Sequence, residues 1–122
     1  MNKPTWINWF EIPSSDFSRA KLFYEKIFDT NLQVMDFGEF KMGVFPSNGL
    51  SGAICAGEGY KPSPAGPLLY LNANPDLQSV LDKVTEAGGR IIKEKTIISE
   101  QWGYMALILD TEGNRLALHS NQ

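Results

Sequence analysis

The chain has 122 residues, of which 43% are hydrophobic and 20% are charged. This length and balance predict one globular domain with a core of its own, and they exclude an intrinsically disordered chain. A formal net charge of -3, together with the lack of any Lys/Arg cluster, argues against electrostatic binding of nucleic acid.

The first half of the chain is predicted to form a strand, a helix and three further strands. Residues 5–12 are rich in aromatic and β-branched side chains, which is typical of a strand. Ser14, Ser15 and Asp16 offer N-cap oxygens to a helix whose apolar stripe runs from Phe17 to Phe28. Turn residues then separate three short strands, expected at 32–37, 41–46 and 52–56.

The second half repeats this order after a segment rich in Gly and Pro at 57–67, which we interpret as a linker. A strand at 68–73 leads to a helix that Asn74 and Pro75 are expected to cap and begin, and that Gly88-Gly89 ends. The remaining strands are expected at 91–97, 104–110 and 115–120, with a hairpin turn at 111–114.

Each half therefore has the order βαβββ. The predicted fold class is α+β, with two such modules whose sheets curve around a shared cleft and whose helices lie on the outer faces. We expect a single domain over 1–122, with module one at about 1–57 and module two at about 68–122.

Three segments carry a family pattern. They are WFEIPSSDFSRAKLFYEKIF at 9–28, the helix at 77–89 that ends in Gly-Gly, and DTEGNRLAL at 110–118. Together they resemble the glyoxalase / bleomycin-resistance / extradiol-dioxygenase superfamily, whose members have the vicinal-oxygen-chelate fold. The third segment is similar to the family's Asp-Pro-x-Gly-Asn hairpin, with Thr111 in place of the proline, and Asp29 stands where glycine is common.

The resemblance implies four metal-ligand positions, with a His or Glu on the first and last strand of each module. The family's spacing places them at Trp9, within 51–56, at about Leu69, and at Ala117. None of these positions carries an imidazole or a carboxylate, and an indole has no lone pair for a metal. We therefore expect no metal or other cofactor there. A displaced divalent metal would have to use Glu11, His119 and Cys55, a poor match to standard sites.

Alternation along the first and last strands predicts which side chains face the cleft. On the first strand, Trp6, Phe10 and Ile12 are expected to face the core, and Trp9 and Glu11 the cleft.

On the last strand, Arg115, Ala117 and His119 are expected to face the cleft, with Leu116 and Leu118 in the core. An aromatic wall with a few polar groups is typical of small-molecule pockets. Trp9 has two equally good explanations: its indole contacts a ligand, or it fills the space that a metal ion would occupy. Tyr60 and Trp102 fit either a lid or surface packing. The predicted ligand-binding residues are Trp9, Glu11, Trp102, Tyr104, Arg115 and His119.

These residues suggest a metal-free protein that binds a small aromatic or amphipathic molecule in the cleft. The alternative is a lyase or isomerase of glyoxalase type that uses a displaced metal or the catalytic candidates Glu11 and His119. A purely structural or regulatory module is a third hypothesis.

The expected partners are a small-molecule ligand and a second copy of the chain in a homodimer, since members of this fold commonly pair. We expect no nucleic acid and no membrane among the partners, because no stretch approaches the length of about 20 apolar residues that spans a bilayer. The single cysteine, Cys55, and the lack of a signal-peptide pattern indicate a cytoplasmic location.

Overall fold

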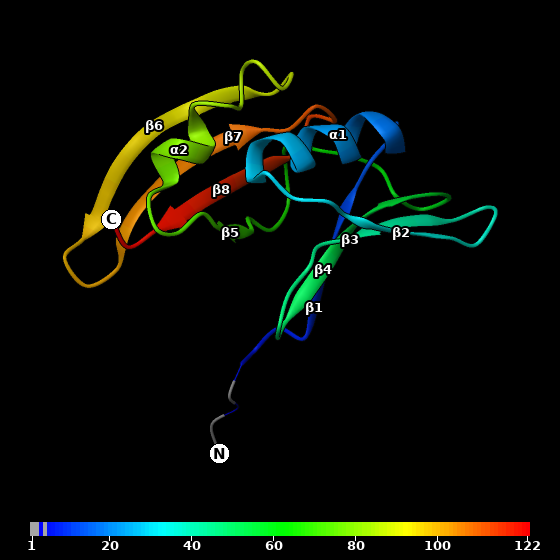
Figure 1. Cartoon of the computed structure of the whole chain (residues 1–122), viewed down its shortest axis with the longest axis horizontal. Coiled ribbons are helices and arrows are strands. Elements are labelled where there is room, and N and C mark those ends of the chain that lie inside the picture. The colour runs from blue at the N-terminus through cyan, green and yellow to red at the C-terminus, as the bar shows by residue number, and fades with distance from the viewer. Residues whose placement is uncertain (1–2, 4) are drawn as a thin grey trace.

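The structure, a computed structural model, describes residues 3 and 5–122 and contains two four-stranded sheets (Figure 1). The first sheet has the order β1-β4-β3-β2, in which β1 pairs parallel with β4 and the other pairs are antiparallel. Its strands are β1 (Trp9–Pro13), β2 (Gln33–Asp36), β3 (Lys41–Val44) and β4 (Ser51–Ala56).

The second sheet has the same internal order, β5-β8-β7-β6, again with one parallel pair, β5 with β8. Its strands are β5 (Tyr70–Asn72), β6 (Arg90–Ser99), β7 (Gly103–Leu109) and β8 (Arg115–Ser120). The predicted α+β fold of two βαβββ modules is therefore confirmed.

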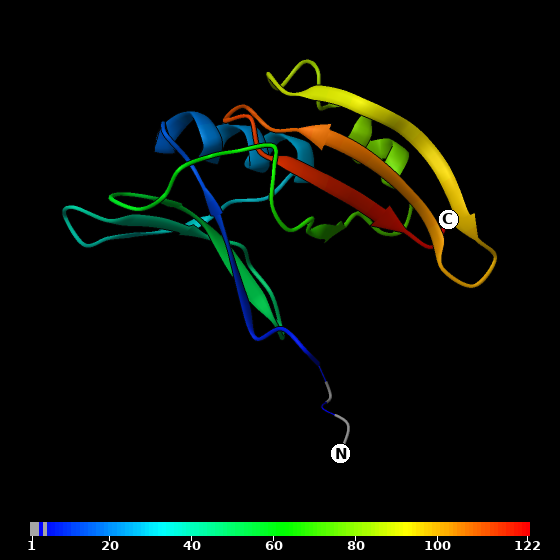
Figure 2. The ribbon, with the colours of Figure 1, turned by 180° about the vertical axis from the view of Figure 1, so that it is seen from behind.

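The two helices, α1 (Phe17–Phe28) and α2 (Leu77–Leu81), lie side by side, while the two sheets diverge from one another (Figures 1 and 2). One apolar cluster joins both modules, because the stripes predicted for the helices are buried against strands of both sheets. Its buried side chains include Phe23, Tyr24, Ile27, Leu77, Leu81, Ile54, Ile108 and Leu116. Among the described residues, no helix is long and apolar enough to cross a membrane.

Several predicted boundaries were wrong at the ends of the elements. The first strand begins at Trp9 rather than at residue 5, and Trp6 is 82% exposed rather than part of the core, because it precedes the paired part of the strand. The second helix is capped by Asp76, whose carboxylate accepts a hydrogen bond from the Gln78 N–H at 2.9 Å. The side-chain oxygen of Asn74 instead accepts a hydrogen bond from the Asn121 N–H.

The turn between β7 and β8 docks onto the first module. The Glu112 carboxylate accepts hydrogen bonds from the backbone N–H groups of Ser15 and Asp16, both at 2.9 Å, and from Arg19 Nε at 2.8 Å. The Tyr24 hydroxyl donates to Asp110 at 2.6 Å. This segment, which carries the family hairpin pattern, therefore fixes the start of α1 and the relative placement of the modules.

Candidate functional site

Glu11 is held by two aromatic side chains on the exposed side of β1. The Trp9 Nε1–H donates to one carboxylate oxygen at 3.2 Å, and the Tyr60 hydroxyl donates to the other at 2.7 Å. The hydrogen bond to Glu11 is the main cause that raises the pKa of Tyr60. Trp9, Glu11 and Tyr60 are called the Glu11 cluster below. Alternation predicts that Trp9 and Glu11 share a face, and their hydrogen bond confirms it.

Tyr60 comes from the segment that connects the two modules, and its ring stacks on Phe40, with 5.4 Å between ring centroids. Phe40 in turn stacks on Phe37 at 5.7 Å. The sequence predicts for Tyr60 only a lid or surface packing. Its hydrogen bond to Glu11 depends on the path of the linker, for which the sequence carries no periodic signal.

His119 and Trp102 lie together on the second module. The His119 Nε2 lies 2.6 Å from the Trp102 carbonyl oxygen, which requires this nitrogen to carry a proton and donate. The Tyr70 ring packs edge-on against His119, with 6.5 Å between centroids. Tyr70, Trp102 and His119 form the His119 cluster. Glu11 and His119 thus have separate partners, and no ion pair joins them among the described residues.

Tyr104 is not part of this face. It packs against the core, and Lys95 Nζ lies 4.6 Å from the centroid of its ring. On β7 the buried side chains Ala106 and Ile108 have the same parity as Tyr104, so the alternation rule itself points Tyr104 toward the core.

Arg115 and Glu11 both line a cavity of about 390 Å³ between β1, the linker and the start of β8. We call it the Arg115 cavity. Its apolar walls include Ile12, Leu69 and Leu116, and Lys61 adds a second cation. This volume lies within the usual range of small-molecule sites, roughly 300–1,000 Å³. Two of the six predicted ligand-binding residues therefore meet at one cavity.

A family model described as the Glyoxalase/Bleomycin resistance protein/Dioxygenase superfamily matches residues 6–118. The chain belongs to this superfamily. The match covers both sheets and the linker between them, so the membership applies to the whole two-module unit.

Solved structures of this superfamily share the fold at low sequence identity. A family enzyme from Burkholderia phytofirmans PsJN has a TM-score of 0.70 and 18% identity, with 94% of this chain and 98% of that chain covered. A glyoxalase/bleomycin resistance protein from Albidiferax ferrireducens T118 has a TM-score of 0.72 and 13% identity, covering 97% and 100%. No curated protein matches the chain.

The side chains at the superfamily's metal positions do not provide ligands for a metal ion in this chain. Ala117 is fully buried and has no donor, and its partner across the parallel pair is Tyr70. Leu69, expected near this position, packs against the core, so Tyr70 replaces it on the face of His119. Among the described residues, no group of three His, Cys, Asp or Glu side chains could hold a metal ion.

Cys55 adds no ligand either. Burial, together with the negative charge of Glu11, raises the pKa of its thiol to about 12, and only a thiolate is an effective metal ligand or nucleophile. The residues present therefore do not fit a divalent metal at the family positions.

Proposed function

We propose that this superfamily member binds a small aromatic or amphipathic molecule in the Arg115 cavity without a metal. The supporting observation is that Glu11 and Arg115, from different modules, line one cavity whose walls are mostly apolar. Lys61 and Arg115 supply two positive charges, and the carboxylate of Glu11 is engaged by Trp9 and Tyr60. This arrangement favours an amphipathic molecule with an apolar body and an acidic group.

The test uses 8-anilinonaphthalene-1-sulfonate, an aromatic anion whose fluorescence rises in apolar surroundings. We expect saturable binding to the wild type and about tenfold weaker binding to Arg115→Gln, because one charge-assisted contact contributes about 1.5 kcal/mol. Arg90→Gln is the matched control, since Arg90 is exposed on β6 and does not line the cavity. Equal weakening by both variants would reject the Arg115 cavity as the site.

Elemental analysis of the purified protein tests the metal-free part of the proposal. We expect no stoichiometric nickel, zinc, iron or manganese, because the family positions carry no imidazole or carboxylate to bind these ions. A tightly held transition metal at one ion per chain would contradict the proposal and revive the hypothesis of a glyoxalase-type lyase or isomerase.

We further propose a homodimer, since large apolar side chains remain exposed on strands of both sheets, among them Val34 on β2 and Ile97 on β6. Contiguous exposed apolar surface is typical of protein interfaces. Size-exclusion chromatography with light scattering should report twice the monomer mass of 13.6 kDa. A monomer at micromolar concentrations would contradict this proposal without affecting the ligand site.

A further inference from the structure

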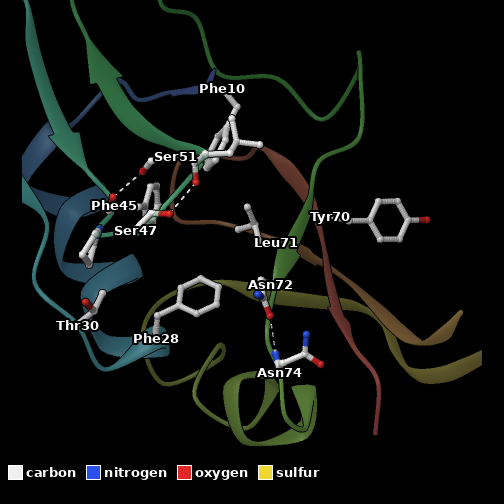
Figure 3. A pocket seen from close by; sticks show the side chains of 12 residues that line it. Phe10, Phe28, Thr30, Phe45, Ser47, Ser51, Tyr70, Leu71, Asn72 and Asn74 are labelled. Atoms are coloured by element: carbon white, nitrogen blue, oxygen red, sulfur yellow. Dashed lines mark hydrogen bonds between the residues drawn. The ribbon is translucent and has the colours of Figure 1, made fainter. Parts of the chain in front are cut away.

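A second cavity, of about 540 Å³, lies between the modules at the other end of β1 (Figure 3). Among the described residues, Phe10 alone lines both this cavity and the Arg115 cavity. Trp9, Glu11, Tyr60, Leu69 and Ala117 are not among its lining residues. Its lining does include Ser51, from the range 51–56 given to one family metal position, and Tyr70, the partner of Ala117 in the parallel pair. We call it the Phe28 cavity; it is lined by Phe10, Phe28, Thr30, Phe45, Pro46, Ser47, Leu50, Ser51, Tyr70, Leu71, Asn72 and Asn74.

The apolar walls of this cavity are held in place by the core. The Phe10 ring lies against Gly52, where an added Cβ would come within 2.5 Å of it. Phe10 also packs on Phe45 at 5.8 Å, and Phe45 packs edge-on against the buried Tyr24 at 5.6 Å. Because these rings are fixed through the core, the cavity offers a preformed aromatic surface rather than one that must be ordered on binding.

The two serine hydroxyls that line the cavity already donate hydrogen bonds within the protein. The Ser47 hydroxyl donates to the Leu50 carbonyl, and the Ser51 hydroxyl donates to the Phe45 carbonyl. No Asp, Glu, Lys or Arg is among its described lining residues, so the cavity offers no charge to an ionic ligand.

Hydrogen bonds define how the side-chain amides of Asn72 and Asn74 are oriented. Asn72 Oδ1 accepts a hydrogen bond from the Asn74 N–H at 3.0 Å, and Asn74 Oδ1 accepts one from the Asn121 N–H at 2.7 Å. Since the two oxygens accept, both side-chain NH₂ groups remain as donors, and neither has an acceptor among the described residues. The cavity therefore combines aromatic walls with amide donors.

We propose that the Phe28 cavity binds a neutral aromatic molecule that carries a carbonyl-type oxygen. The aromatic rings of Phe28 and Phe45 contact the body of the ligand, and the NH₂ groups of Asn72 and Asn74 donate to its oxygen. This site is separate from the Arg115 cavity, whose cations favour an acidic molecule, and the inference stands whether or not that cavity is occupied.

The probe is 6-propionyl-2-dimethylaminonaphthalene, a neutral naphthalene ketone whose fluorescence reports the polarity of its surroundings. We expect saturable binding to the wild type and loss of binding in Thr30→Trp, because the indole fills the cavity. Ser18→Trp is the matched control, an exposed position on α1, the helix that Thr30 follows, and outside the cavity. Failure of the wild type to bind saturably, or equal loss in both variants, would overturn the proposal.

A second pair of variants tests the asparagine donors. Asn72→Asp and Asn74→Asp keep a side-chain oxygen for the backbone N–H that each now binds, but they remove the NH₂ donors. Each should weaken binding of the ketone about tenfold while the circular dichroism spectrum stays unchanged. Unchanged affinity in both would overturn the assigned donors. Weakening by Arg115→Gln instead would place the probe in the other cavity and overturn the proposal.

Discussion

Phe23 reaches from α1 to the second module because residue 89 has no side chain. A Cβ on Gly89 would lie 2.7 Å from the Phe23 ring and 2.7 Å from the Leu109 carbonyl oxygen. Gly88-Gly89 is predicted from the sequence to end the second helix, but α2 ends at Leu81 and the chain reaches Gly88 through turns. Gly88 does adopt a left-handed φ of 103°, but the role of Gly89 is close packing between modules.

Replacing Gly89 by Ala should therefore destabilise the fold by about 1–3 kcal/mol, because a buried methyl group would displace either a fixed ring or a strand carbonyl. Urea unfolding followed by circular dichroism measures the change. Gly49→Ala is the matched control, since no atom lies within 4 Å of the Cβ it would add. A loss of stability at position 49 as large as at position 89 would contradict the packing argument.

The candidate site shows which single residues a sequence can place. Two-residue alternation puts Trp9 and Glu11 on one face, and the structure agrees because β1 is a regular strand. The same rule, counted from the buried Ala106, places Tyr104 in the core. No periodic pattern predicts the position of Tyr60, because its contact with Glu11 depends on the path of the irregular linker over the first sheet.

The start of α1 is the clearest example at the scale of the elements. Its Asp16 side chain caps the helix as predicted, accepting from the Arg19 N–H, but two further N–H groups are satisfied by Glu112 from the far end of the chain. Burial opposes ionisation of Glu112, yet the hydrogen bonds from Arg19, Asp16, Thr111 and Ser15 outweigh it and lower its pKa to about 2.

This capping contact should make stability depend on pH. Because the folded-state pKa of Glu112 lies below the unfolded value of 4.5, its contribution is present above pH 4.5 and is lost as the pH falls toward 2. Glu112→Gln should lower the free energy of unfolding by about 2 kcal/mol at neutral pH and flatten the loss of stability between pH 4.5 and 2. Chemical unfolding at several pH values measures both effects.

The exposed Glu58 provides a control for this pH series. Glu58→Gln should leave the stability and its pH dependence close to those of the wild type, because no described residue makes a hydrogen bond to its side chain. If Glu112→Gln lost as much stability in acid as the wild type, the Glu112 carboxylate would not be the group that makes the free energy of unfolding depend on pH.

At the scale of the whole molecule, the alternating strands and helical stripes predict the two-module fold, because each periodic pattern states which side of its own element is buried. The cavities are different. Each is lined by residues of both modules, so its shape depends on how β1 lies against β5 and the linker. Local patterns carry no information on that placement, which the turn at 110–114 and the joint core determine.

Because one core serves both modules, they should unfold together. Tyr24→Phe removes the hydroxyl that donates to Asp110 from the other module, and it should cost about 1–2 kcal/mol. The loss is limited because Asp110 also accepts from the N–H groups of Glu112 and Asn114. Far- and near-ultraviolet circular dichroism should report one coincident transition, shifted to lower urea with an unchanged slope.

Tyr104→Phe provides the comparison, because the Tyr104 hydroxyl has no hydrogen-bond partner among the described residues and its ring keeps its place against the core. It should leave the midpoint nearly unchanged. Two separated transitions in Tyr24→Phe would mean that the modules fold independently. The two cavities would then lie between modules that move relative to one another, and they would not be preformed binding sites.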